Sequence, residues 1–197
     1  MHRNSLLMFE RYAKTHFRPG LRVLEIGPDT NRWLYRNLVN DPSINWESVE
    51  LSKAEGVTYV ARSEYEFPME SDTYDIVLSG QVIEHVRKIW IWIREVARVC
   101  KPGGLVITIC PVNWPYHAHP HDCWRIFPDG MRSLYEEAGL EMELCEFGSL
   151  ELSTARFALH GRSPYRNLTA VINRAIGRRG VHGRALDTIA IGRKVKA

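Results

Sequence analysis

Short segments rich in apolar residues alternate along this chain with segments in which apolar residues recur at helical spacing. The clearest example is Gln81–Cys100, whose apolar residues fall on one helical face, followed by the largely apolar segment Leu105–Cys110. Between them, Lys101–Gly104 carries the Pro-Gly-Gly sequence that ends a helix. An uncharged apolar segment of this length is typical of a strand covered on both faces of a parallel sheet. The alternation therefore predicts an α/β fold with a doubly wound sheet.

The remaining segments continue the same pattern. Residues 1–20 are expected to form an N-terminal helix, because apolar residues between Ser5 and His16 follow helical spacing and Pro19-Gly20 ends it. The other predicted strands are Arg22–Ile26, a strand ending at Val49-Glu50, Val57–Ala61, Tyr74–Ser79, Leu140–Phe147 and Asp187–Arg193. Further helices are predicted after Trp33 and over Pro128–Ala138. One domain of 197 residues accommodates these elements around a single core.

The composition is that of a globular protein, with 45% hydrophobic and 25% charged residues. No apolar run approaches the roughly 18 residues that span a bilayer. The N-terminus also lacks the cationic start, apolar block and cleavage site of a secretory signal, so a cytoplasmic location is expected. The four cysteines form no C-x-x-C pair, which argues against a zinc knuckle and against a dithiol redox motif.

The charge is unevenly distributed, although the net charge is only +3. Residues 151–197 hold ten Lys or Arg and two acidic residues, whereas the preceding residues hold 16 basic and 21 acidic ones. We expect residues 151–184 to form a basic insertion or lid between the last two strands. Three interpretations stay open: a solvated cationic face, a grip on a phosphate-bearing acceptor, and a peripheral contact with an anionic membrane surface.

A glycine-containing turn follows the first predicted strand. Arg22–Ile26 runs into Gly27-Pro28-Asp29 and then a helix, which presents backbone N–H groups and the positive end of the helix dipole at the carboxyl edge of the sheet. Glu50 ends the next strand, where a carboxylate can accept both hydroxyls of a ribose. The alternative interpretation is an ordinary turn and a surface carboxylate. Together the two features indicate a nucleotide-type ligand.

Four ordered segments carry a resemblance to a known family. They are Val23–Pro28, Val49–Ser52, Tyr74–Val86 and Val99–Gly104. In sequence, order and spacing they resemble the class I S-adenosylmethionine-dependent methyltransferases over roughly residues 20–150, and Asp187–Lys194 resembles the family's closing strand. The resemblance implies a Rossmann-like sheet of seven strands, mostly parallel, with an antiparallel pair of strands at the C-terminal end of the chain.

The resemblance also implies a cofactor, S-adenosylmethionine, with S-adenosylhomocysteine as product. It assigns Glu25, Gly27, Pro28 and Asp29 to the methionine part, Glu50 to the ribose, Leu51 to the adenine, Ser63 with Glu64 to the adenine amino group, and Gln81 to the methionine end. His85 follows Glu84 near the cofactor in the family, and we expect a structural role for it. The chain departs from the family in two places. Asp29 and Asn31 replace motif glycines, and the connection between the second and third strands is too short for its usual helix.

The segment after Leu105–Cys110 is the best source of a catalytic base. Transfer of a methyl group from a sulfonium to a hydroxyl requires in-line positioning and removal of a proton. We expect His121, oriented by Asp122, to act as the base, with His119 as the next candidate. His117, Trp124 and Arg125 are expected to contact the substrate. A metal bound by the alternating histidines at 117, 119 and 121 is the weaker interpretation, and no metal is expected.

The sequence thus predicts a methyltransferase that modifies a hydroxyl, in preference to an amine, of a small-molecule or sugar-containing acceptor. The stretch from Pro120 to Gly130 resembles methyltransferases of polysaccharide and secondary-metabolite biosynthesis. Three alternatives remain: a cofactor-binding but non-catalytic partner subunit, an RNA methyltransferase, and an NAD-type oxidoreductase. The G-x-G-x-x-G spacing of the last is missing. No RNA-binding module is present, which argues against a nucleic acid partner.

Overall fold

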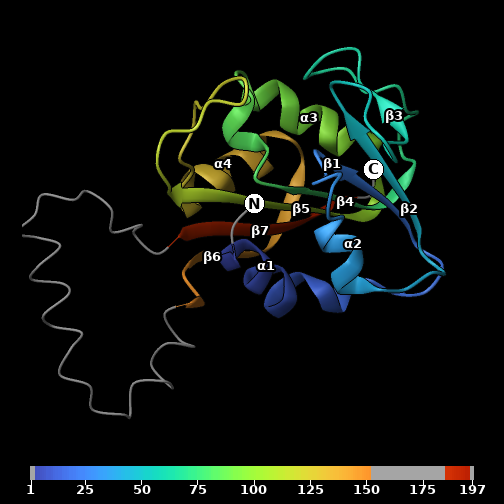
Figure 1. The fold of residues 1–197 in the computed structure, drawn as a ribbon, viewed down its shortest axis with the longest axis horizontal. Coiled ribbons are helices and arrows are strands. Elements are labelled where there is room, and N and C mark those ends of the chain that lie inside the picture. Colours follow the sequence, from blue (N-terminus) through green and yellow to red (C-terminus); the bar gives the residue numbers. More distant parts are fainter. Residues whose placement is uncertain (1–2, 152–184, 196–197) are drawn as a thin grey trace, which may run out of the picture.

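The computed structural model describes residues 3–151 and 185–195. Their strands form one seven-stranded sheet in the order β3-β2-β1-β4-β5-β7-β6 (Figure 1). The strands are β1 (Arg22–Ile26), β2 (Asn45–Glu50), β3 (Tyr59–Val60), β4 (Tyr74–Gly80), β5 (Cys100–Asn113), β6 (Leu140–Gly148) and β7 (Leu186–Lys194). Neighbouring strands from β3 to β5 pair in parallel, and β7 pairs antiparallel with both β5 and β6. The predicted mostly parallel sheet with an antiparallel β6/β7 pair is confirmed.

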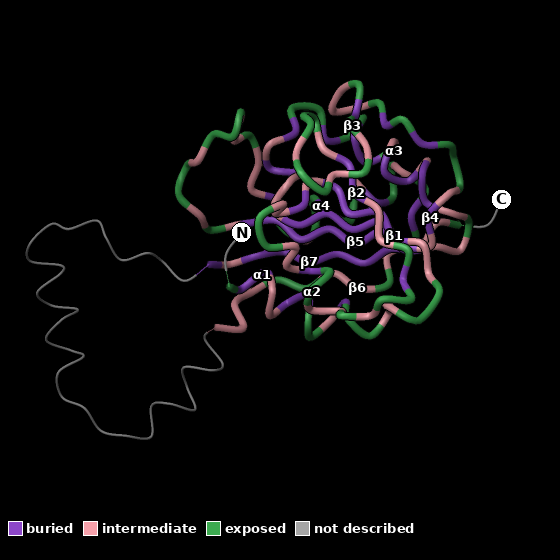
Figure 2. Tube along the Cα trace, turned by 45° about the vertical axis from the view of Figure 1, so that its right-hand side comes forward, coloured by how far each residue is buried: buried purple, intermediate pink, exposed green. Residues whose placement is uncertain are grey.

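Helices cover both faces of the sheet (Figure 1). One face packs against α3 (Ile89–Val99) and α4 (Pro128–Glu137). The other face packs against α1 (Arg3–Met8), the π-helical turn η1 (Phe9–Ala13) and α2 (Leu34–Val39). Side chains alternate along β1, so that Leu24 belongs to the first core and Val23 to the second. The central strands are accordingly the buried part of the molecule, as Figure 2 shows.

The N-terminal helix is present but is not uniform. It continues from α1 and η1 into the 3-10 turn η2 (Lys14–His16). The expected absence of a helix between β2 and β3 also agrees with the structure, since residues 51–58 contain only turns and bends. The predicted lid, residues 151–184, lies almost wholly outside the described residues, together with the helical pattern around Leu168–Ile176. Within the described residues, no helix is both long enough and apolar enough to cross a bilayer. The expected cytoplasmic location stays a prediction.

The predicted helix over Gln81–Cys100 is divided in the structure. A 3-10 turn, η3 (Ile83–His85), is separated from α3 by residues 86–88, of which Val86 is extended. Gln81 has a φ of 60°, in the left-handed region, and its N–H donates to the carbonyl of Ile109 at 2.8 Å. This tie to β5 prevents helical geometry from starting at Gln81. The break leaves Gln81 and η3 beyond the carboxyl end of β4, where a ligand site of a doubly wound sheet is found.

Candidate active site

A cavity of about 180 Å³ lies at the carboxyl edge of β1, β2 and β4. Its polar lining comes from Gly27, Glu50, Glu64, Gln81, His85 and His119. Its apolar lining comes from Ile26, Val49, Leu51, Ala61, Phe67, Val82, Val86, Trp92 and Pro120. An apolar chamber with a few convergent polar groups is the usual character of a small-molecule site.

Gly27 forms the wall of this cavity that follows β1. Its φ is +63°, and a Cβ at this position would lie 2.5 Å from Cγ2 of Val82. Its N–H donates to the carbonyl of Val49 at 3.0 Å, which holds the turn against the end of β2. Both the left-handed backbone and the close approach of Val82 require glycine. The single family glycine that this turn retains is therefore the one that the packing requires.

Two carboxylates lie on the cavity wall. Glu50 is half-buried, and its Oε2 accepts from the N–H of Leu51 at 3.1 Å. Burial raises the pKa of Glu50, and the hydrogen bond from Leu51 partly offsets that rise. Glu64 lies across the cavity, where its Oε2 accepts from the N–H of Arg87 at 3.4 Å. The ribose role of Glu50 stays a prediction, and the contact with Arg87 places Glu64 near the start of α3.

Gln81, which also lines the cavity, is held in place by a residue of β7. Its Nε2 donates to Oδ1 of Asp187 at 3.2 Å, and Asp187 is completely buried at the start of β7. Nδ2 of Asn4 donates to the other oxygen of Asp187 at 2.6 Å. Sequence reasoning missed Asn4 and Asp187 as supports of the site because their contacts join the two ends of the chain.

Four of the predicted cofactor residues are not among the cavity-lining residues: Glu25, Pro28, Asp29 and Ser63. The carboxylate of Glu25 is buried, with Oε2 accepting from Nε1 of Trp46 at 2.9 Å. Burial raises the pKa of Glu25 to about 7, against the lowering effect of the Trp46 hydrogen bond. The carbonyl of Asp29 accepts from the N–H of Trp33 at 2.7 Å and so closes the turn before α2.

The loop between β5 and α4 carries the predicted catalytic residues, and one guanidinium organises it. Arg125 pairs with both carboxylate oxygens of Asp122, and its Nη2 also donates to the carbonyl of Trp114 at 3.1 Å. The Arg125 hydrogen bonds hold the pKa of Asp122 well below its usual range. Oδ2 of Asp122 also accepts from the backbone N–H of His117 at 2.8 Å. The carboxylate of Asp122 therefore binds Arg125 and the backbone of His117. The prediction was that it would orient the side chain of His121.

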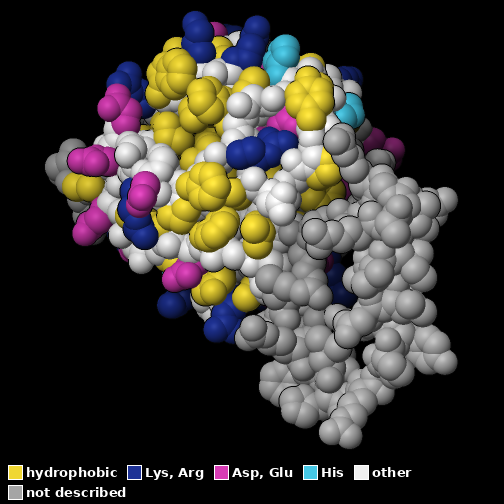
Figure 3. All heavy atoms as spheres, turned by 90° about the vertical axis from the view of Figure 1, so that its left-hand side faces the viewer, with side chains coloured by type: hydrophobic (Ala, Val, Ile, Leu, Met, Phe, Trp, Pro, Cys, Tyr) yellow, Lys and Arg dark blue, Asp and Glu magenta, His cyan; other side chains and the backbone are white. Residues whose placement is uncertain are grey.

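Of the three alternating histidines, His119 is the one that lines the cavity. The carbonyl of His121 accepts from the N–H of His119 at 3.2 Å and from Nδ1 of His85. Trp124 donates from Nε1 to the carbonyl of Val86 at 2.8 Å, which fastens the loop to the segment before α3. Figure 3 faces the end of the molecule where this loop lies, and it shows histidine side chains at the surface beside hydrophobic ones.

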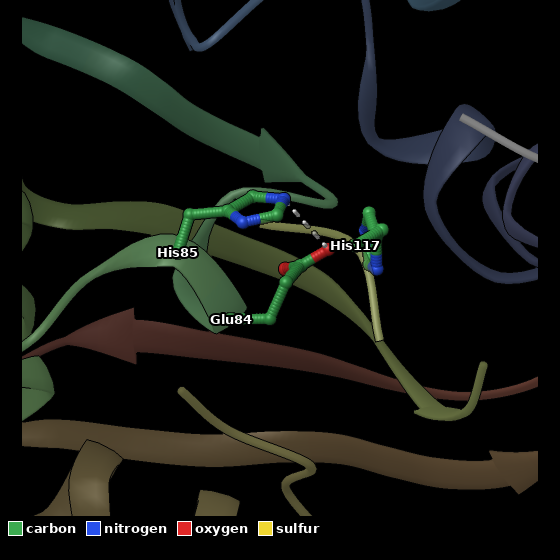
Figure 4. Close-up of side chains that lie close together, drawn as sticks. All are labelled: Glu84, His85 and His117. Atoms are coloured by element: carbon green, nitrogen blue, oxygen red, sulfur yellow. Dashed lines mark ion pairs between the residues drawn. The ribbon is translucent and has the colours of Figure 1, made fainter. Parts of the chain in front are cut away.

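Glu84 and His85 were not assigned to the site from the sequence. Glu84 is completely buried, and burial raises its pKa to about 8. His85 lines the cavity, and burial lowers its pKa. Together with His117 they bring three potential ligand atoms within 4.8 Å of one another (Figure 4). The Glu84-His85 pair lies in one of the family-like motifs, so a signal was present in the sequence. The contribution of His117 depends on the fold of the loop.

Comparison with known proteins finds similarity to methyltransferases. A family model described as a methyltransferase domain matches residues 38–108, from α2 into β5. A protein from Mycobacterium bovis named an uncharacterized methyltransferase is 45% identical over 63 residues, covering 31% of this chain and 24% of that protein. A second one, from Mycobacterium avium, is 34% identical over 87 residues, covering 43% of this chain and 34% of that protein. The chain therefore spans about a quarter to a third of the length of these relatives.

Solved structures share the whole fold at low sequence identity. An S-adenosylmethionine-dependent methyltransferase from Archaeoglobus fulgidus has a TM-score of 0.61 at 18% identity, covering 96% of this chain and 92% of that one. Phosphoethanolamine N-methyltransferase 2 of Haemonchus contortus, solved with S-adenosyl-L-methionine, has a TM-score of 0.62 at 15% identity, covering 98% of this chain and 52% of that one. Fold and local sequence similarity thus relate this chain to methyltransferases: the family model matches residues 38–108, and the solved S-adenosylmethionine-dependent methyltransferases share its fold.

Proposed function

We propose that this protein binds S-adenosylmethionine in the cavity at the carboxyl edge and transfers its methyl group to a hydroxyl of a small-molecule acceptor. The observation that carries the proposal is the combination of the Gly27 turn and the half-buried Glu50 on one apolar cavity. Both lie where the strand order of a doubly wound sheet changes direction, which is the ligand position of such folds.

The cavity offers a complementary surface to each part of the cofactor. Glu50 accepts hydrogen bonds from the ribose hydroxyls, and Leu51 with the neighbouring apolar residues covers the adenine. Gln81, fixed by Asp187, faces the methionine end. Glu25, near the end of β1, and Pro28 with Asp29, in the turn that follows, support this end, and Ser63 supports Glu64. S-adenosylhomocysteine leaves the same binding site after the methyl group has been transferred.

On the acceptor side, we propose His119 as the group that accepts the hydroxyl proton, because it is the histidine of the loop that lines the cavity. His121 holds His119 through its carbonyl, and Asp122 holds the backbone of His117. Arg125 and Trp124 keep the loop in place, and we propose that they also contact the acceptor. An alcohol needs a base more than a neutral amine does, so a base at this position favours transfer to oxygen.

Calorimetric titration with S-adenosylmethionine and with S-adenosylhomocysteine tests the cofactor claim. We expect one site per chain for each compound. Glu50→Ala should weaken both by about ten-fold or more, because a charged hydrogen-bond partner is lost. Glu70→Ala, which changes an exposed carboxylate elsewhere on the surface, should bind as the unaltered protein does. Absence of binding, or equal losses in the two variants, would remove the basis of the proposal.

A second experiment separates an active enzyme from a non-catalytic binding subunit. The protein is incubated with S-adenosylmethionine and a panel of hydroxylated small molecules, with and without sugar or phosphate groups, and formation of S-adenosylhomocysteine is followed. We expect turnover with at least one of them. His119→Ala should lose turnover while keeping cofactor affinity. Cofactor binding without turnover on any acceptor would favour the non-catalytic alternative.

A further inference from the structure

Glu84 is a buried carboxylate for which the part of the chain that the structure describes supplies no hydrogen-bond partner. It lies in η3 with no exposed surface, and neither carboxylate oxygen has a hydrogen-bond partner among the described residues. A carboxylate removed from water is costly unless it is paired, binds a metal ion or takes up a proton. Figure 4 shows the carboxylate extending toward the imidazoles of both His85 and His117. The environment therefore contains two nitrogen ligands but no donor that satisfies the acid.

The two imidazoles are prepared to act as ligands. Nδ1 of His85 contacts the carbonyl of His121, and Nδ1 of His117 lies 3.0 Å from the carbonyl of Pro115. A carbonyl only accepts, so each contact selects the tautomer with the proton on Nδ1. Nε2 is then left with its lone pair. A backbone carbonyl behind a ring N–H is the usual support of a metal-binding histidine.

The distances suit one shared ion. Nε2 of His85 lies 3.8 Å from Oε1 of Glu84, too far for a hydrogen bond. Ligand atoms about 2.1 Å from a tetrahedral ion are about 3.4 Å apart, whereas the three candidate atoms lie within 4.8 Å of one another, so the group must close by up to about 1.4 Å around an ion. Asp122 accepts from Arg125 and from the backbone N–H of His117, and it thereby holds His117 in position.

We propose that Glu84, His85 and His117 bind one divalent transition-metal ion at the mouth of the cofactor cavity. Two imidazoles and one carboxylate suit zinc, manganese or iron(II), whereas magnesium and calcium prefer oxygen ligands. Three protein ligands leave at least one position open for another oxygen. The ligand set differs from the alternating histidines at 117, 119 and 121, because among the described residues only the His117 imidazole of that group has a ligand atom within 4.8 Å of those of Glu84 and His85.

The catalytic use of the ion depends on the proposed function. His85 lines the cavity, so an acceptor hydroxyl that binds the ion lies beside the cofactor seat. The ion lowers the pKa of that hydroxyl, and its proton passes to His119. A lone pair of the oxygen then forms the bond to the methyl carbon, while the electrons of the breaking carbon–sulfur bond go to sulfur. The products are the methyl ether, S-adenosylhomocysteine and a protonated histidine that releases its proton to water.

Metal binding is tested without cofactor or acceptor. The full chain is freed of metal with a chelator and titrated with Co²⁺, whose visible absorption reports the ligands, and then with Zn²⁺ as competitor. We expect one Co²⁺ per chain at this site and a higher melting temperature with Zn²⁺. Glu84→Gln and His117→Gln should each weaken binding by about ten-fold or more. His16→Gln, a histidine on the other side of the sheet, should bind as the unaltered protein does.

Circular dichroism confirms that each variant is folded, and His117→Gln, in a loop, remains informative if the buried Glu84→Gln does not fold. Equal affinity in the unaltered protein, Glu84→Gln and His117→Gln would overturn the proposal, as would no Co²⁺ binding. The outcome is distinct from that of the cofactor titration. Failure to bind S-adenosylmethionine refutes the proposed function and leaves the metal result standing, whereas cofactor binding without Co²⁺ binding refutes the metal site alone.

Discussion

A side-chain methyl group at position 27 has no room beside Val82. Gly27→Ala combines an unfavourable left-handed backbone, about 1–2 kcal/mol, with a 2.5 Å contact that adds about 1–3 kcal/mol. Gly20 is the matched control, because its φ is +79° and a Cβ there meets nothing within 4 Å. Urea unfolding should therefore show a larger loss for Gly27→Ala than for Gly20→Ala. Equal losses would mean that Val82 yields freely and that packing does not require this glycine.

Glu25 makes the stability of the protein depend on pH. Its pKa is raised from 4.5 to about 7 by burial, so the folded state binds the proton more tightly than the unfolded chain. This contribution is complete below the unfolded value and is lost as the pH rises through about 7, up to roughly 3 kcal/mol. Glu25→Gln removes the titration and keeps an acceptor for Nε1 of Trp46. The free energy of unfolding of the variant should fall less between pH 5 and pH 8.

The control for that experiment is Glu70→Gln, which changes an exposed carboxylate and should fall with pH as the unaltered protein does. The same slope in Glu25→Gln and in the unaltered protein would contradict the account of Glu25. Other buried acids, including Glu84, contribute in the same direction. Only the difference between the variant and the unaltered protein is therefore informative.

At the scale of elements, the loop between β5 and α4 depends on Arg125. Lysine at this position keeps the charge but cannot form the paired hydrogen bonds with Asp122 or reach several carbonyls at once. Arg125→Lys should cost about 1–2 kcal/mol, since the guanidinium is only partly exposed. Hydrogen exchange should become faster at the amides of His117 and Cys123, which bond to Asp122 and to the carbonyl of Glu84.

Arg94→Lys provides the comparison, because Arg94 pairs with Glu137 on the exposed surface between α3 and α4. Exchange at His117 and Cys123 should be unchanged in that variant. If Arg125→Lys also leaves both amides protected, the loop is held by its other contacts, such as the hydrogen bond of Trp124 to Val86.

The strands could be predicted from the sequence, whereas the turns of the site could not. Uncharged apolar segments such as Leu105–Cys110 have one stable position in a sheet covered on both faces, so their pattern determines the architecture. The helix over Gln81–Cys100 was placed too early, since the left-handed backbone of Gln81 depends on a hydrogen bond to Ile109. No local pattern encodes that bond, because its partner belongs to another strand.

The candidate site likewise has residues that could be predicted from the sequence and residues that could not. Glu50 and Gln81 follow directly from strand ends and motif order, and both line the cavity. The grouping of His117 with Glu84 depends instead on the path of a loop that Arg125 fixes. The alternation of the histidines drew attention to His121, whereas the structure gives Asp122 to His117 and Arg125. A periodic pattern identifies which residues share a face only where the backbone is regular.

At the scale of the whole molecule, the carboxyl ends and the amino ends of the parallel strands form two edges of the sheet with different properties. The carboxyl edge holds the cavity of Gly27, Glu50 and Gln81. The opposite edge holds a second hollow lined by residues that include His16, Lys101 and Arg193. The lysine and arginine of this second hollow attract anions. The carboxylate of the cofactor's methionine part therefore does not by itself determine at which edge the cofactor binds. The proposed function places the cofactor at the carboxyl edge.

Amide chemical shifts measured during a titration with S-adenosylhomocysteine test this claim most directly. A cofactor site in the cavity predicts saturable changes at Gly27, Glu50, Leu51 and Gln81, with little change at Lys101 on the opposite edge. The same titration on Glu50→Ala should need a higher concentration to reach the same changes. Shifts confined to the edge of Lys101, or no saturable shift at either edge, would contradict a cofactor site in the cavity.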